Sequence, residues 1–433
     1  MAADTDAPSR SIDVRRAAFY FSLVYFSQGV CQPVTLLNQP LRMYLQDVAH
    51  FNAEQIAGFF FVVLIPWMTK PLYGLLSDFV PLFGYRRKSY LLLLNLLAAI
   101  AFLVSTGVRS TDMLLLMLTL TGVGVAASDV VVDAMMVHAG RESGRTRLFQ
   151  GLQWTSINVA AIGSGLGGAY ICNRYAADAP AALRTACWIA GCIPLIVATL
   201  TWFLVTDERA SMNLPELRAT TRALFGAFKS RHLWLVVAFL FLINFNPGTV
   251  TPMYDYLEHR VGLDHAFLAV LDTVSAAGMA AGALAFTVFM SGRMSTKLAV
   301  SLGLIVGALG LLPMVAISGK TSAVVAHLAF GVTYMIASLS QLTVAAEACP
   351  RRVEAVVFAA LMSVNNLSRS WCDVLGSRLY EGPLAHHIAP LILASAALTA
   401  AGLLFVPFLR PVARDSVNGS AVAPSPTDAQ PSR

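Results

Sequence analysis

The stretch IPWMTKPLYGLLSDFVPLFGYRRKSY, residues 65–90, decides how this chain is to be interpreted. It begins as an apolar run, carries a lysine at position 70 and an acid at position 78, and ends in the basic triplet RRK. A lysine is costly inside a lipid bilayer and ordinary in water. The meaning of this lysine therefore depends on whether the stretch crosses a membrane.

The composition indicates a polytopic integral membrane protein. Of the 433 residues, 57% are hydrophobic and 12% are charged, and the mean hydropathy is +0.66. A soluble domain is typically about 25% charged. The net charge of +6 does not indicate a nucleic-acid partner, because basic residues of membrane proteins set orientation. The six cysteines show no metal-binding spacing, so we expect neither a metal nor another cofactor; Cys172 and Cys187 flank one short loop and could form a disulfide.

About twenty apolar residues span the hydrocarbon core as a helix, and this length predicts an all-α protein with twelve transmembrane helices. A polar segment without a cleavable signal, residues 1–16, precedes them, and residues 410–433, rich in Ser, Pro and Ala, are expected to form a disordered tail. The candidate spans are residues 17–37, 54–76, 89–106, 113–138, 148–171, 185–205, 233–256, 265–290, 298–317, 322–346, 355–380 and 387–409.

The longest connection, residues 206–231, is polar and basic and divides the chain into two six-helix bundles, residues 17–205 and 232–409. This is the layout of the major facilitator fold. Lysines and arginines of the loops gather on the side that holds this connection, whereas the other side holds Arg42, Arg109, Arg174, Arg184, Arg260 and Lys320. The basic side faces the cytoplasm, so we expect both termini to be cytoplasmic and the connection to be a central cytoplasmic loop.

The opening stretch can then be placed at the cytoplasmic connection between the second and third helices. It resembles the loop motif of major facilitator proteins, in which a glycine and an acid precede a glycine with paired bases, although FVPLF lengthens the spacing. The places are filled by Gly74, Asp78, Gly84, Arg86 and Arg87, and Lys88 follows. The resemblance implies that the acid clasps the opposite bundle and holds a cytoplasmic gate closed. Alternatively, the three bases only set orientation.

The lengthened form points to a narrower group. PWMTKPLYGLLSDFVPLFGYRRKSYL resembles the folate–biopterin transporter family, also called the BT1 family, within the major facilitator superfamily. YFSQGVCQPVTLLNQPLRMYL, ASDVVVDAMMV and RRVEAVVFAALMSVNNLSRSWCDVLGSRLY resemble the first, fourth and eleventh helices of that family. The resemblance implies twelve helices and uptake of folates or reduced pterins, often together with protons.

Charged residues at bilayer depth usually face a cavity or a partner. Lys70 either lines the cavity, as a cation for an anionic substrate or an ion-pair partner, or extends to the cytoplasmic headgroups. Asp129 and Asp133 lie four residues apart, so they share a helix face and cannot both ionise cheaply. Such acids could hold the hydrogen-bonding edge of a pterin or carry a coupling proton; alternatively one is paired with Lys70 or Arg369.

The eleventh span carries a second polar group. Arg369 and Asp373 are four residues apart; the guanidinium suits the carboxylates of folate, while the acid could take part in coupling, or the two could neutralise each other. Asn365 and Asn366 offer amides that donate and accept. Gln28 is a weaker candidate, since such residues commonly form interhelical hydrogen bonds.

These observations predict a secondary transporter of the cell membrane that works by alternating access. We expect it to import folate or pterin compounds with protons, as a monomer. A carrier of another polar or aromatic organic anion would keep the fold and change the cavity. A membrane enzyme or receptor is disfavoured, because the chain has no catalytic triad, phosphate-binding loop or metal-ligand set.

Overall fold

A computed structural model describes residues 13–207, 209, 212, 214–290, 293–349 and 354–409. Within this part of the chain the regular structure is helical, apart from isolated bridges of Tyr85 with Leu82 and Arg209. Eight helical stretches of the described residues are long and apolar enough to cross a membrane. The segments 1–12 and 410–433, for which we predicted a polar start and a disordered tail, lie outside the described residues.

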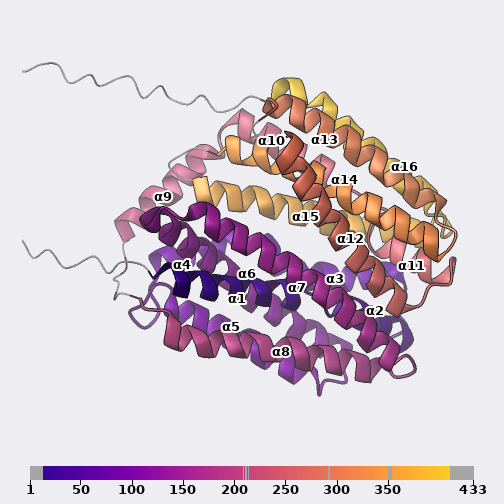
Figure 1. Ribbon diagram of the computed structural model, residues 1–433, viewed down its shortest axis with the longest axis horizontal. Coiled ribbons are helices and arrows are strands. Elements are labelled where there is room, and N and C mark those ends of the chain that lie inside the picture. The colour runs from indigo at the N-terminus through magenta and orange to yellow at the C-terminus, as the bar shows by residue number, and fades with distance from the viewer. Residues whose placement is uncertain are drawn as a thin grey trace, which may run out of the picture.

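The N-terminal half of the protein contains eight helices in the order of the chain (Figure 1). They are α1 (Val14–Cys31), α2 (Asn38–Asp47), α3 (Ala53–Met68), α4 (Lys70–Phe79), α5 (Lys88–Ser105), α6 (Thr111–Ser143), α7 (Thr146–Arg174) and α8 (Ala179–Leu204). The expected first span is interrupted after Cys31, and the expected second span is interrupted at Thr69 and extends to Phe79.

The C-terminal half follows a connecting helix, α9 (Leu214–Ala227), which we had expected to be loop. Its helices are α10 (Arg231–Ile243), α11 (Thr251–His259), α12 (His265–Ala285) with a π-turn at Phe286–Met290, α13 (Thr296–Leu311) with a 3₁₀ end at Leu312–Ala316, α14 (Lys320–Glu347), α15 (Glu354–Glu381) and α16 (Ala389–Ala401), followed by 3₁₀ turns at Gly402–Leu404 and Val406–Phe408. The expected seventh span is divided between α10 and α11.

The remaining expected spans, beyond the eight apolar ones, correspond to α1, α7, α10 with α11, and α15. These four segments are either interrupted or rich in polar side chains, and α7, α11 and α15 lie where the two halves meet. Polar residues are tolerated at membrane depth when they face protein or a cavity. The helices of the described residues thus account for all twelve expected spans of an all-α protein.

The two halves lie one above the other in Figure 1, with α9 at one end of the molecule and α2 and α11 at the other. We call these the α9 end and the α2 end. Helix α15 packs along α3, and α12 packs on α7, where a side chain at Gly165 would collide with Thr273. At the α9 end, Asp207 accepts hydrogen bonds from the backbone N–H groups of Arg87 and Lys88, at 2.7 and 3.0 Å, and so caps the start of α5.

The cysteines are free thiols, and Cys192 is the exposed one among the six. Cys172 and Cys187, which we considered as a disulfide, are each buried and unbonded. Their burial in the core of the N-terminal half agrees with a packing role.

Candidate functional site

Lys70 is the first residue of α4, immediately after the break in the second span. Its ammonium lies 2.6 Å from Oδ2 of Asp129 on α6 and 4.5 Å from the centre of the Trp67 ring. The Lys70 side chain is 18% exposed and that of Asp129 is 3% exposed. The lysine therefore lies against an acid inside the N-terminal half and does not extend toward headgroups.

Asp133 lies one turn further along α6, on the same face as Asp129. Its Oδ1 accepts a hydrogen bond from the Tyr25 hydroxyl at 2.6 Å and another from Nε2 of Gln153 at 3.0 Å. Lys70 supplies one positive charge for two carboxylates. One acid of the pair is thus matched by a cation, and the other is held by neutral hydrogen-bond donors.

Two further polar atoms of this region are buried and have no hydrogen-bond partner among the described residues. They are Oε1 of Gln28, which is one turn beyond Tyr25 on α1, and the indole nitrogen Nε1 of Trp67, whose ring lies under Lys70. A buried polar atom without a partner carries a free-energy penalty of about 1–3 kcal/mol. An acceptor and a donor close to the paired charges are therefore available to a polar ligand or to water.

The polar residues of α15 have different surroundings. Arg369 is exposed on the bundle-facing side of its helix, the side that carries Asn365 and Asp373, with its guanidinium 5.6 Å from the centre of the Tyr334 ring. Asn365 accepts from Asn244 at 3.2 Å, and Asn366 donates to the backbone carbonyl of Trp67 at 3.0 Å.

Asp373 does not pair with Arg369 among the ion pairs of the described residues. Its carboxylate instead accepts two hydrogen bonds from Thr251 of α11, one from the backbone N–H and one from the hydroxyl, both at 2.8 Å. The mutual neutralisation that we considered for Arg369 and Asp373 is replaced by this contact. Arg369 is exposed and takes part in none of the arginine or lysine ion pairs found among the described residues.

Our sequence analysis missed Arg42, which we had counted as a loop residue. It lies in α2, is 3% exposed, and is held between the rings of Phe60 and Tyr254, at 4.7 and 4.4 Å. Its guanidinium donates to Oδ1 of Asn38 at 3.1 Å and to the Thr251 hydroxyl at 3.2 Å. Because Thr251 also donates to Asp373, Arg42 is linked across the two halves to an acid of α15. The proline two positions earlier, which places Arg42 in a helix, was the available signal.

A second carboxylate is bound across the same interface. Asp272 of α12 accepts from Tyr254 within its own half and from Asn38 and Gln39 of the N-terminal half, at 3.0 and 3.3 Å. Near the surface of the α2 end, Gln46 donates to Glu258 at 2.7 Å, and the N–H of Ala53 donates to Glu381 at 2.8 Å. The halves are therefore joined by hydrogen bonds at the α2 end.

The predicted gate residues lie at the α9 end. Asp78 lies 3.8 Å from a guanidinium nitrogen of Arg87, and Gly74 faces Val130 of α6. Burial lowers the pKa of Arg87, while the charges of Asp78 and Asp207 oppose that effect. These contacts stabilise the loop within its own half. The clasp of Asp78 on the opposite bundle stays a prediction.

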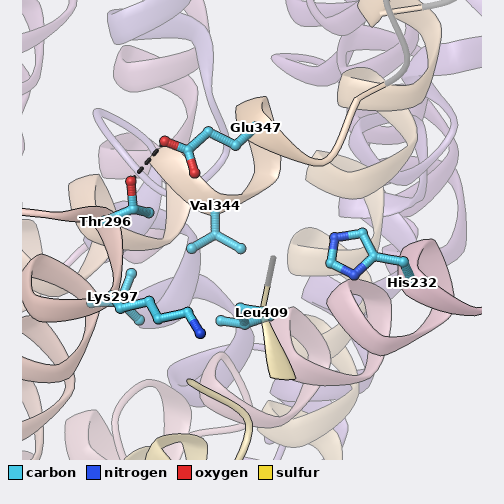
Figure 2. A pocket seen from close by; sticks show the side chains of 7 residues that line it. His232, Thr296, Lys297, Val344, Glu347 and Leu409 are labelled. Atoms are coloured by element: carbon cyan, nitrogen blue, oxygen red, sulfur yellow. Dashed lines mark hydrogen bonds between the residues drawn. The ribbon is translucent and has the colours of Figure 1, made fainter. Parts of the chain in front are cut away.

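A small cavity also lies at the α9 end, between the ends of helices of the C-terminal half (Figure 2). It measures about 20 Å³, room for about one water molecule. Glu347 accepts a hydrogen bond from Thr296 at 2.7 Å beside it. The rest of the wall is formed by His232, Lys297, Val300, Val344 and Leu409. None of the predicted substrate residues lines it, so we do not assign it to the substrate.

The sequence profile of the BT1 family matches residues 28–388. The chain belongs to the BT1 family. The folate-biopterin transporter of Synechocystis sp. is 28% identical over 82% of this chain and 73% of its own length. Probable folate-biopterin transporter 4 of Arabidopsis thaliana is 25% identical over 82% and 87%. Folate transporter 1 of Plasmodium falciparum is 21% identical over 83% and 71%.

Solved structures support the fold of this BT1 protein. The nucleoside transporter NupG superposes with a TM-score of 0.67 at 11% identity, over 91% of this chain and 98% of its own. A mutant of the E. coli fucose:proton symporter FucP gives 0.63 at 15% identity, over 93% and 100%. The BT1 protein is thus a multi-pass membrane transport protein and not an enzyme, as expected.

Proposed function

We propose that this BT1 protein is a secondary active transporter that imports folate or pterin compounds by alternating access, driven by protons. The observation that carries the proposal is the group formed by Lys70, Asp129 and Asp133, with unpartnered polar atoms of Gln28 and Trp67 beside it. The names of three relatives as folate or folate-biopterin transporters support the substrate class.

The chemistry of this group suits the pterin ring. A pterin presents a ring N–H and an exocyclic amine side by side, and one carboxylate can accept both hydrogen bonds. Asp133 or Asp129 would hold this edge, and Gln28 would accept a further bond from the ring. Lys70 would neutralise the acids while no ligand is bound.

Recognition of folate needs a second contact, because folate adds a glutamate tail with two carboxylates. Arg369 is exposed on the bundle-facing side of α15, and a guanidinium binds carboxylates through paired hydrogen bonds. We therefore assign the ring to the N-terminal half and the tail to the C-terminal half, where Asn365 would be a further contact. The substrate would then connect the two bundles as they move.

Alternating access requires contacts that form on one side at a time. In this structure hydrogen bonds from Asn38, Arg42 and Gln46 join the halves at the α2 end. We assign that end to the outside, so these contacts would form the outer gate. The inner gate would be formed at the α9 end by Gly74, Asp78, Arg86, Arg87 and Lys88, with both termini in the cytoplasm.

The coupling proton would be carried at Asp133, because its matching donors are the neutral groups of Tyr25 and Gln153. Asp373 is the second candidate. It accepts a hydrogen bond from the Thr251 hydroxyl, which in turn accepts one from Arg42, so the cation reaches it only through Thr251. The bundles at residues 17–205 and 232–409, the intervening cytoplasmic loop and a monomeric state are parts of the same proposal.

Uptake of labelled folate and biopterin into cells that express the protein tests this function. We expect uptake of at least one compound above control cells, and a loss of accumulation when a protonophore is added. Uptake of neither compound, together with uptake of another aromatic anion, would favour the alternative substrate class. Uptake that is insensitive to the protonophore would remove the coupling step and leave the substrate assignment intact.

The orientation is tested by accessibility. Single cysteines placed at Ser110 and Gly262 should react with a membrane-impermeant thiol reagent added to intact cells, whereas one at Ser143 should react only after permeabilisation. The first two positions lie in connections at the α2 end, and the third lies at the α9 end. Labelling of the Ser143 position in intact cells would reverse the assignment of sides.

A further inference from the structure

The break in the second span leaves the backbone carbonyl of Trp67 without its helical donor. In a continuous helix the carbonyl of Trp67 would accept from the N–H of residue 71, but that residue is Pro71, which has none. The helix ends at Met68 and resumes at Lys70. A buried carbonyl that lacks a partner is destabilising, so the donor that replaces the missing N–H matters.

The replacement comes from the other half of the protein. Nδ2 of Asn366 on α15 donates to the Trp67 carbonyl at 3.0 Å. Trp67 lies fourteen residues from Ala53, which is about 21 Å along a helix from the α2 end. This hydrogen bond therefore joins the halves deep inside the molecule, three residues before Lys70, which pairs with Asp129.

A proline inside α8 provides a comparison. Pro194 cannot donate to the carbonyl of Ala190, and the Cys31 thiol of α1 lies 3.4 Å from that oxygen. Both partners there belong to the N-terminal half, so their contact can persist when the two halves move. The contact of Asn366 with Trp67 spans the two halves and cannot persist if α3 separates from α15.

We propose that Asn366 is a positioning residue: it completes the broken second span from the opposite bundle and thereby fixes Lys70 against Asp129 while the α2 end is closed. Trp67 links Asn366 to Lys70. Its carbonyl accepts the hydrogen bond from Asn366, and its ring lies 4.5 Å from the Lys70 ammonium. Separation of α3 from α15 would release the Trp67 backbone and with it the cation. The substrate-binding role that we first gave to Asn366 is replaced by this one.

The test uses two measurements. Uptake rests on the proposed transport function, whereas thermal unfolding of the protein needs no ligand. The design is a double-mutant cycle of Asn366→Ala and Pro71→Ala, because Pro71→Ala restores a backbone N–H that can bond to the Trp67 carbonyl. Thermal unfolding of the purified ligand-free protein and initial uptake rates are measured for the four proteins. A cycle isolates the interaction between two positions.

We expect Asn366→Ala alone to lower the unfolding temperature by about 2 °C and uptake by about tenfold, as the loss of a hydrogen bond to a buried carbonyl predicts. In the Pro71→Ala background both losses should shrink at least threefold. Pro194→Ala is the matched control: it restores an N–H elsewhere and should leave the effect of Asn366→Ala unchanged. If Asn366→Ala lowers the unfolding temperature and the uptake rate equally with and without Pro71→Ala, the proposal is overturned.

If Pro71→Ala does not yield folded protein, the variants Asn366→Leu and Asn366→Gln test the positioning role instead. Leu has the same number of side-chain heavy atoms and the same branch point as Asn but cannot donate, whereas Gln keeps the amide. Under the proposal, Asn366→Leu lowers the unfolding temperature of the ligand-free protein, and Asn366→Gln restores part of the loss. A residue that only binds substrate would leave ligand-free stability unchanged in both variants, and that result would reject the positioning role even if uptake is lost. A wild-type protein that transports no folate or pterin would refute the proposed function and leave this stability test standing.

Discussion

The ammonium of Lys70 lies 2.6 Å from the carboxylate of Asp129, and the next acid on the same helix face, Asp133, is held by a tyrosine and a glutamine. One lysine thus serves two acids in a region of low polarity. The carboxylate of Asp129 is matched by the Lys70 ammonium, whereas the carboxylate of Asp133 is held by neutral donors and can bind a proton or a ligand. Each of the two acids should therefore respond differently to mutation.

Removal of one member of the Lys70–Asp129 pair should be more harmful than removal of both. Lys70→Met leaves a buried carboxylate, and Asp129→Asn leaves a largely buried ammonium, each of which should lower the free energy of unfolding by about 3 kcal/mol. The double variant carries no unmatched charge and should recover most of that loss. Thermal unfolding of the purified proteins measures this, and additive losses in the double variant would contradict the ion pair.

Asp133→Asn should uncouple transport from the proton gradient. The amide cannot exchange a proton, so accumulation that depends on an acidic exterior should disappear. Exchange of labelled for unlabelled substrate should persist if Asp129 holds the pterin edge, and should fall as well if Asp133 holds it. Uptake at several external pH values and counterflow in vesicles measure the two activities. Asp112→Asn, an exposed acid in the first turn of the same helix, is the control and should behave as wild type. Unchanged pH dependence in Asp133→Asn would transfer the coupling role to another acid.

Arg369→Gln should discriminate between ligands. Only folate has the glutamate tail, so its affinity should fall by about ten- to a hundredfold, the equivalent of one charge-assisted hydrogen bond, while that of biopterin should change little. Binding of both ligands to purified protein provides the measurement, with Arg184→Gln, an exposed arginine of α8, as the control. Equal losses for the two ligands would refute the division between ring and tail.

A reversible cross-link should hold the α2 end closed. Gln46 and Glu258 belong to opposite halves, and their side chains are 2.7 Å apart. After Cys192→Ser removes the exposed thiol, a bifunctional thiol reagent that spans the gap left by the two shortened side chains should link Gln46→Cys to Glu258→Cys and stop uptake, and a reductant that cleaves the link should restore it. The pair Glu258→Cys and His265→Cys, whose native side chains are 3.1 Å apart within one half, is the control, because a link there constrains no movement between halves. Uptake that continues in the cross-linked Gln46–Glu258 pair would show that this end need not open.

The sequence was sufficient for the fold but only partly for the site. Hydropathy and loop charge predicted twelve spans, and the order of charges within them identified Lys70, Asp129 and Asp133. Arg42 escaped because it lies beside an expected helix end, where arginine usually contacts headgroups; only tertiary packing shows that it is enclosed by Phe60 and Tyr254. The partner of Asp373 was equally hidden, since Thr251 is 122 positions away and weakly polar.

The polarity of α1, α7 and α15 also has a consequence for biosynthesis. Among the described residues, these helices fall outside the eight stretches that are long and apolar enough to cross a membrane. A nascent helix leaves the translocon for lipid only when its own transfer free energy is favourable, so polar helices must wait for neighbours that cover them. Since α7 packs on α12, which is synthesised only after the central connection, insertion of α7 is completed only when part of the C-terminal half has been made.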